Sequence, residues 1–262
     1  MKRIVQSFCL LFFTLFTTQI GFAQNPRQIV HVFVALADNE HQGIVPVPKA
    51  LGNGDDAENN LYWGAAFGVK TFFSKSSDWA KISSESKGGK FLIERVIFVH
   101  LKSKTILIAD AYRGREIKQA LADFFSAAAG LEKAGTFEIQ GPDGSKTVEA
   151  LADLVVYVGH DGLMDFSVDK TFPGTDKPKR QTIVLACASK QYFSGSLKPT
   201  GAEPLLWTTN LMAPEAYTLK AALDGWIAGE SNEQIRHRAA SAYAKYQKIS
   251  QGEALKLFAT GW

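Results

Sequence analysis

The stretch LVVYVGHDG, residues Leu154–Gly162, and the stretch TIVLACAS, residues Thr182–Ser189, decide how this chain folds. Each is a short apolar run rich in Val and Ile that ends in a turn, a pattern typical of a buried strand. Parallel strands of an α/β sheet place the residues that follow them at one edge, where such folds bind ligands. We therefore expect His160 and Cys187, which follow these two strands, to stand side by side at that edge.

The rest of the chain alternates between strand and helix patterns. Such alternation is typical of a three-layer α/β sandwich with a mostly parallel central sheet, and we predict one such domain over 24–262. Strands are predicted at 28–37, 91–99, 105–109 and 203–209, with two short edge strands around the turn at 141–144. Helices are predicted at 61–73, 115–129, 213–228 and 232–258, a connection at 74–89 and a turn at 192–196.

The N-terminus has the pattern of a secretory signal peptide. Lys2 and Arg3 provide the positive start, an apolar core runs over 8–16, and small residues precede a predicted cleavage before Gln24. The apolar core is about half of the roughly 20 residues that a bilayer span needs, so no stable membrane anchor is expected. The pattern predicts that residues 1–23 are removed and that the protein is exported, to the periplasm or outside the cell.

Charge and cysteine content exclude several classes of partner and cofactor. Without Lys2 and Arg3 the formal charge falls from +3 to +1, and no basic stripe remains to attract nucleic acid. Loss of Cys9 with the signal leaves Cys187 alone, which excludes an internal disulfide framework. No pair of His or Cys residues has the spacing of a zinc site, so neither a metal nor another cofactor is expected. The oligomeric state stays open.

The chemistry that suits these residues is acyl transfer. A thiol becomes a strong nucleophile when a neighbouring imidazole takes its proton, which assigns the attack on a carbonyl to Cys187 and the proton transfers to His160. Backbone N–H groups around Asp161, Gly162 and Cys187 are the expected donors to the oxyanion that forms. Each residue also has an ordinary explanation, since a lone Cys is often a buried thiol and a lone His often a hydrogen-bonded turn residue.

Turns after two other predicted strands bring further polar residues to the same edge. Asp38 and Glu40 follow the first strand and, with Asp165, are candidates to line a pocket for a basic substrate side chain, unless they belong to a solvated loop. Asn210 follows the strand after Cys187. Asn210 and Trp207 are candidate walls of the substrate site, although Trp207 suits a core position equally well.

The two strand ends resemble the caspase, legumain and gingipain group of cysteine peptidases. In that group a His-Gly turn follows one strand and an Ala-Cys turn follows the next, and the matching segments here are GHDG and ACAS. The resemblance implies a caspase-like fold, a catalytic dyad of His160 and Cys187, an oxyanion donor at Gly162 and a peptide or protein substrate. Asp161 stands where the group usually has Gly.

Two functions are open at this point. The first is an exported cysteine-dependent hydrolase, a peptidase in the simplest case, which acts through Cys187 and His160. The second is a catalytically silent caspase-like domain that binds a peptide or protein through the same edge. The enzyme predicts a thiolate at neutral pH, and the binding module predicts an ordinary thiol. A serine α/β hydrolase is less favoured, because the Gly-x-Ser-x-Gly motif is absent.

Overall fold

The structure is a computed structural model that describes residues 28–141, 144–174 and 179–262. The predicted signal peptide at 1–23 lies outside these ranges, as does the tip of the predicted turn at 142–143. Within the described ranges, no helix combines the length and the apolar character that crossing a membrane requires.

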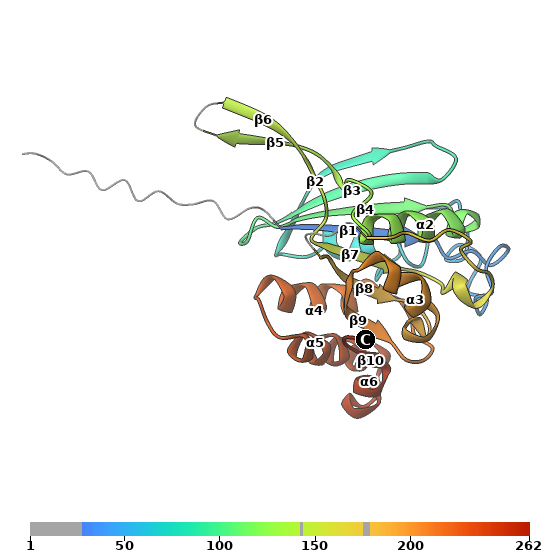
Figure 1. Ribbon diagram of the computed structural model, residues 1–262. Coiled ribbons are helices and arrows are strands. Elements are labelled where there is room, and N and C mark those ends of the chain that lie inside the picture. The colour runs from blue at the N-terminus through green and yellow to red at the C-terminus, as the bar shows by residue number, and fades with distance from the viewer. Residues whose placement is uncertain (1–27, 142–143, 175–178) are drawn as a thin grey trace, which may run out of the picture.

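A mixed eight-stranded sheet, built from the described residues, forms the centre of the molecule (Figure 1). The neighbouring strands β9, β8, β7, β1 and β4 run parallel, while β10 at one edge and β3 and β2 at the other run antiparallel to their neighbours. A separate hairpin pairs β5 with β6. The strands are β1 Ile29–Ala35, β2 Trp79–Ser86, β3 Leu92–His100, β4 Ile106–Tyr112, β5 Gly135–Gly141, β6 Gly144–Ala150, β7 Leu154–Val158, β8 Gln181–Leu185, β9 Glu203–Thr208 and β10 Phe258–Ala259.

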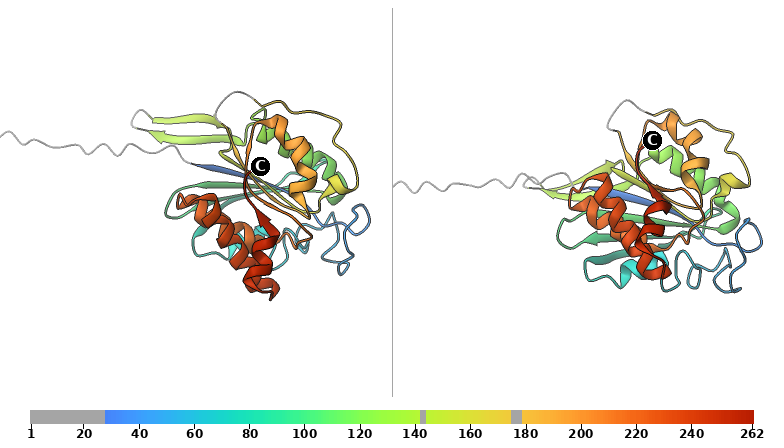
Figure 2. Two further views of the ribbon diagram at one scale, coloured as in Figure 1. Left: turned by 60° about the horizontal axis from the view of Figure 1, so that its bottom comes forward. Right: turned by 90° about the horizontal axis from the view of Figure 1, so that it is seen from below.

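Helices cover both faces of this sheet (Figure 2). The buried side chains of α2 and α3 belong to the core on one face, and those of α1, α4, α5 and α6 to the core on the other. The prediction of a three-layer α/β sandwich with a mostly parallel centre is confirmed. The α-helices are α1 Val69–Ser74, α2 Ile117–Ala128, α3 Ser189–Leu197, α4 Ala216–Ile227, α5 Asn232–Gln247 and α6 Gln251–Leu257, and short 3-10 helices are η1 Gly114–Glu116, η2 Gly162–Met164 and η3 Lys198–Thr200.

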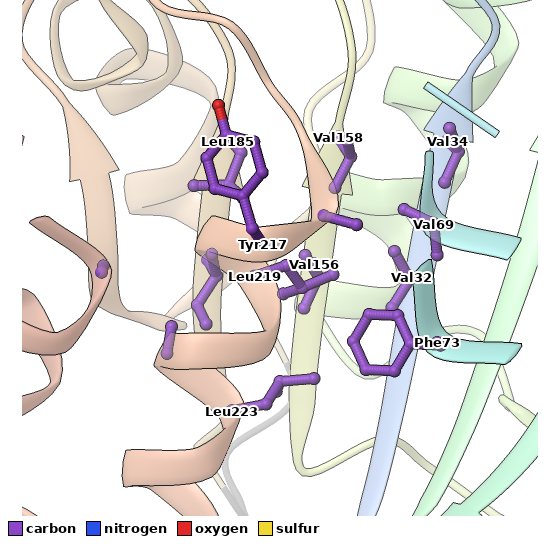
Figure 3. Packing of buried hydrophobic residues seen from close by; sticks show 14 of the residues in the cluster. Val32, Val34, Val69, Phe73, Val156, Val158, Leu185, Tyr217, Leu219 and Leu223 are labelled. Carbon is purple, nitrogen blue, oxygen red and sulfur yellow. The ribbon is translucent and has the colours of Figure 1, made fainter. Parts of the chain in front are cut away.

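Alternating side chains of the central strands build both layers of the core. Val32 of β1 and Val156 of β7 point to the face that α4 covers, where Leu219 belongs to the same buried cluster (Figure 3). On the opposite face, the ring of Phe33 packs edge-on against Phe124 of α2, with centroids 6.3 Å apart. Strands that are buried on both faces need apolar side chains almost throughout, which is why these segments are near-continuous apolar runs in the sequence.

Two segments predicted as loops form regular structure. The segment 74–89 contains β2, an edge strand with mostly Ser, Lys and Glu side chains, so it lacks the apolar run of a buried strand. The turn predicted at 192–196 is part of α3, where Phe193 and Leu197 are buried against the sheet. Packing of these two side chains outweighs the low helix propensity of Gly195 and its neighbouring Ser residues.

The helix predicted at 61–73 is shorter than expected. Regular helix begins only at Val69. Gly68, just before it, lies against the backbone of Trp63, and an added Cβ there would approach the Trp63 carbonyl carbon to 2.4 Å. The glycine therefore serves a compact series of turns over 61–68 rather than a close helix–sheet contact.

A buried charged cluster joins β1, β3 and β4. Asp110 of β4 is almost fully buried, and its carboxylate accepts hydrogen bonds from His31 Nε2 (2.8 Å) and from Arg95 Nε and Nη2 (both 2.6 Å). Burial alone would raise the pKa of Asp110, but these hydrogen bonds lower it to about 2. The resulting stabilisation is fully present above the unfolded carboxyl pKa of about 3.9 and is lost as the pH falls through the folded pKa.

We expect Asp110→Asn to lower the free energy of unfolding at neutral pH by about 3 kcal/mol, because Arg95 and His31 lose their buried anionic partner. Urea denaturation followed by circular dichroism measures the change. Asp169→Asn is the matched control: it removes an exposed partner of Lys118, and should cost less than about 1 kcal/mol. A loss for Asp110→Asn no larger than that of the control would contradict a stabilising role for the cluster.

Candidate active site

The turn after β7 holds His160 close to the sheet. Gly159 has a φ of 154°, and its N–H donates to the Leu185 carbonyl of β8 at 3.2 Å. A Cβ at Gly159 would lie only 3.0 Å from the Ala35 carbonyl oxygen, at the end of β1. The Tyr157 hydroxyl donates to the His160 carbonyl at 2.8 Å. These contacts fix the backbone at His160 relative to three neighbouring strands.

A carboxylate orients the His160 side chain. His160 Nε2 lies 2.7 Å from Asp165 Oδ2, and the same oxygen accepts the Gly43 N–H at 3.3 Å. A hydrogen bond to a carboxylate requires a proton on Nε2, so the neutral ring has its lone pair on Nδ1. This Nδ1 forms no hydrogen bond with any residue that the structure describes, which leaves it available as a base.

The turn after β8 places Cys187 directly before α3. The next residue, Ala188, has the left-handed conformation (φ 45°, ψ 33°), which costs a residue other than Gly roughly 1–2 kcal/mol. Its N–H donates to the Asn210 carbonyl at 2.9 Å. Cys187 Sγ accepts the Met212 N–H at 3.4 Å, and its thiol donates to the Met212 carbonyl at 3.6 Å. The segment after β9 therefore holds both the sulfur and the strained residue, and strain of this kind concentrates at functional sites.

Ser189 and Thr208 stabilise the same turn through hydrogen bonds. The Ser189 N–H donates to Thr208 Oγ1 at 3.2 Å, and the Thr208 N–H donates to Ser189 Oγ at 2.9 Å. Thr208 Oγ1 also donates to the Ala186 carbonyl. Ala186, Ser189 and Thr208 are all buried. Their hydrogen bonds connect the turn to β9 and fix the backbone on either side of Cys187.

The three residues whose N–H groups are predicted oxyanion donors differ in availability. The Gly162 N–H already donates to the His160 carbonyl at 3.1 Å, so it is not free to bind an oxyanion in this conformation. The N–H groups of Asp161 and Cys187 make no hydrogen bond within the part of the chain that the structure describes. Cys187 lines the cavity, whereas Asp161 is fully buried and is not among the lining residues, so Cys187 offers a backbone donor at the cavity. Gly162 has a packing role instead, since a Cβ there would lie 2.7 Å from the Phe166 ring.

Cys187 and His160 line one cavity of about 400 Å³. Its other walls come from the loop after β1, from the turns before α1, from the turn that contains η2 and from the segment between β9 and α4. The structure therefore brings the predicted nucleophile and the predicted base to the same site. The surrounding side chains are mostly apolar and include Ile44, Val45, Tyr62, Met164, Leu211 and Met212.

The surroundings of the sulfur favour the protonated thiol. Burial raises the pKa of Cys187, the Met212 N–H opposes this shift, and the negative charge of Asp161 adds to it. Burial also raises the pKa of Asp161 to about 7, although its Oδ1 accepts the Leu163 N–H at 3.0 Å. The thiolate of Cys187 is therefore disfavoured at neutral pH, and a nucleophilic role for Cys187 would require a base that takes the thiol proton.

Asp38 and Glu40 lie away from this cavity. Asp38 is buried, and its Oδ1 accepts the N–H groups of Glu40 (2.9 Å) and His41 (3.1 Å). Both residues line a smaller hollow of about 190 Å³ that the loop after β1 forms largely by itself. This placement corrects the prediction of a substrate-binding role: the Asp38 carboxylate caps its own loop and has no free access to a substrate at Cys187.

Trp207 and Asn210 do not line the cavity either. Trp207 is fully buried in the core, with its ring centroid 5.4 Å from that of Trp262, which corrects its predicted role as a substrate wall. Asn210 is exposed, and its Oδ1 accepts the N–H of Leu211 at 2.8 Å. Asn210 therefore acts on the site only through its carbonyl, which holds Ala188, while the adjacent Leu211 provides the wall.

Three further residues of the site do not follow from local sequence patterns. Asp165, predicted at most as an acidic pocket residue, binds His160 instead. Tyr62 lines the cavity, and burial raises the pKa of its hydroxyl, which remains a hydrogen-bond donor. Glu215 also lines the cavity. For Asp165, the sequence signal that could have predicted its role is its short spacing from His160 within one turn. Tyr62 and Glu215 come from loops whose paths depend on tertiary packing, so no local pattern predicts them.

Among the described residues, no group of three or more His, Cys, Asp or Glu side chains is arranged to hold a metal ion. Comparisons of the chain with protein-family models, with curated proteins and with solved structures found no match.

We expect the rate of Cys187 alkylation by iodoacetamide to rise with pH to a midpoint above the ordinary thiol value of 9.0, because burial and the charge of Asp161 raise the pKa of Cys187. Asp161→Asn should lower this midpoint, since it removes the negative charge but keeps the oxygen that accepts the Leu163 N–H. Mass spectrometry of the alkylated peptide measures both rates. Asp169→Asn, on an exposed loop, is the control. A midpoint near neutral pH in the unmodified chain would contradict this description of the site.

Proposed function

We propose that the protein is an exported cysteine-dependent hydrolase, a peptidase in the simplest case, with a caspase-like arrangement of its catalytic strands. The observation that carries the proposal is that Cys187 and His160 line one cavity while Asp165 holds His160 through Nε2. The adjacency of β7 and β8 supports the caspase-like part, because His160 follows one strand and Cys187 the other. Export rests on the signal-peptide pattern at 1–23.

In the proposed reaction, the Cys187 sulfur forms a bond to the carbonyl carbon of an amide while its proton passes to His160 Nδ1. The Cys187 N–H stabilises the oxyanion. Collapse of this intermediate breaks the carbon–nitrogen bond, and the leaving amine takes the proton from His160. Water then adds to the thioester, the carbon–sulfur bond breaks, a carboxylic acid leaves and the thiol regains its proton.

Asp165 has a supporting role in this reaction. Its carboxylate keeps the proton of neutral His160 on Nε2, which leaves the lone pair of Nδ1 for the thiol. It also stabilises the imidazolium that forms when Nδ1 takes the thiol proton. This stabilisation matters because burial raises the pKa of Cys187 and makes that proton harder to remove.

A second candidate function is a catalytically silent domain that binds a peptide or protein at the same cavity. The protonated resting thiol and the charge of Asp161 next to it favour this alternative, because both weaken the nucleophile. The two functions differ in turnover: both predict binding at the cavity, and only the hydrolase predicts cleavage that depends on Cys187.

We expect the chain without residues 1–23 to cleave members of a quenched-fluorescence peptide library. Cys187→Ala should abolish cleavage, and His160→Ala should lower kcat/KM by about 10²- to 10⁴-fold, because general base catalysis is lost. Asp165→Asn should cause a smaller loss, up to about 100-fold, because the imidazole remains but is less well oriented. Asp169→Asn is the matched surface control.

Either of two results would contradict the hydrolase. Cleavage that persists in Cys187→Ala would assign the activity to another group or to a contaminant. Saturable binding of a library peptide without any cleavage would favour the binding module.

A further inference from the structure

We infer that the cavity beside Cys187 selects a large apolar side chain, of the size of Leu, Met or Phe, on the acyl side of the bond to be cleaved. This selectivity rests on the proposed hydrolase and deepens it by naming the substrate class. Three observations support it. The exposed side chains at the mouth of the cavity are apolar, the more buried wall is apolar, and the carboxyl group of Glu215, which also lines the cavity, already accepts hydrogen bonds.

Three apolar side chains from three separate segments stand exposed around the cavity. Val45 is 84% exposed, Leu211 is 66% exposed and Met164 is 41% exposed. Val45 comes from the loop after β1, Met164 from η2 and Leu211 from the segment after β9. Apolar surface that converges on one pocket is unfavourable in water, and it is typical of a binding site that an apolar group covers.

The more buried part of the wall is apolar as well. Tyr62, Met212 and Pro214 line the cavity and are buried. A volume of about 400 Å³ exceeds that of a single Leu or Phe side chain and lies within the range of pockets that enclose small ligands. No Lys or Arg is among the described residues that line the cavity. An acidic substrate side chain would therefore lose its hydration, and the basic side chain in this lining, His160, already binds the carboxylate of Asp165.

Glu215 is the group that would favour a cationic substrate instead. Its Oε2, however, already accepts hydrogen bonds from the Tyr217 hydroxyl (2.8 Å) and from Gln247 Nε2 (3.1 Å). Burial raises the pKa of Glu215, so its surroundings do not favour the negative charge. A Lys or Arg side chain would have to leave water for a wall that is apolar elsewhere, in exchange for a carboxyl group that neutral donors already bind.

Peptidyl acyloxymethyl ketones test this selectivity. When the cavity binds the probe side chain next to the ketone, Cys187 Sγ forms a bond to the methylene carbon of the probe. The bond from that carbon to the carboxylate leaving group breaks, and the thiol proton passes to His160. Probes that differ only in the residue next to the ketone carry Leu, Phe, Arg, Lys or Asp. Mass spectrometry of the modified Cys187 peptide gives each labelling rate, and iodoacetamide, which needs no pocket, gives the reactivity of the thiol itself.

We expect the Leu and Phe probes to label Cys187 at least about tenfold faster than the Arg, Lys and Asp probes. Faster labelling by a charged probe would overturn the apolar selectivity and leave the proposed hydrolase intact. Labelling by none of the probes, with iodoacetamide still modifying Cys187, would overturn the hydrolase and the selectivity together.

A variant of the cavity mouth separates binding of the side chain from reactivity of the thiol. Leu211→Asn replaces an exposed apolar side chain by a neutral polar one, and should slow labelling by the Leu and Phe probes about tenfold without changing the iodoacetamide rate. Ile82→Asn, at a 60% exposed position on the edge strand β2, is the matched control and should change neither rate. Unchanged labelling of Leu211→Asn by the Leu and Phe probes would overturn the selectivity.

Discussion

The parallel pairing of β7 with β8 is the constraint on which the site depends. The register sets Val158 opposite Leu185, so the two strands end at the same level, and the Gly159 N–H continues the ladder by one step. Both faces of these strands are buried, so a slip of one residue would exchange the side chains that face the two layers of helices. Burial of the apolar side chains therefore fixes the register, and the register brings His160 and Cys187 to the same edge of the sheet.

Strand register alone does not orient the two functional side chains; segments distant in the sequence complete the site. Asp165, which the Gly43 N–H also contacts, holds the imidazole, so the loop after β1 contributes to the base without supplying a catalytic group. The sulfur accepts the Met212 N–H from the segment after β9. The cavity therefore exists only when the first loop, the η2 turn and the segment before α4 are all in place. The segments that hold His160 and Cys187 also supply side chains that line the cavity.

The sequence predicts the sheet better than it predicts the destinations of side chains. The apolar run 154–158, at the start of the first quoted stretch, has the same bounds as β7. The run 182–186, at the start of the second, is β8 shifted by one residue, since β8 begins and ends one residue earlier. Both agree because buried parallel strands must be apolar runs. Polar residues follow no such rule. Asp38 follows a strand at the same edge yet caps its own loop. Trp207, in β9, has its side chain in the core. Only the path of the surrounding loops decides these outcomes, and local patterns do not encode that path.

The negative charge of Asp161 affects the protonation of Cys187 and therefore the chemistry open to the site. A negative charge near a half-buried thiol opposes the thiolate, so a preformed thiolate–imidazolium pair is disfavoured here. An apolar substrate side chain that displaces water from the cavity would strengthen this effect, because it lowers the local dielectric around the sulfur. In the proposed hydrolase, proton transfer to His160 would therefore accompany attack on the carbonyl rather than precede it. The imidazolium would then appear only during the reaction, and the carboxylate of Asp165 would stabilise the transition state more than the resting enzyme.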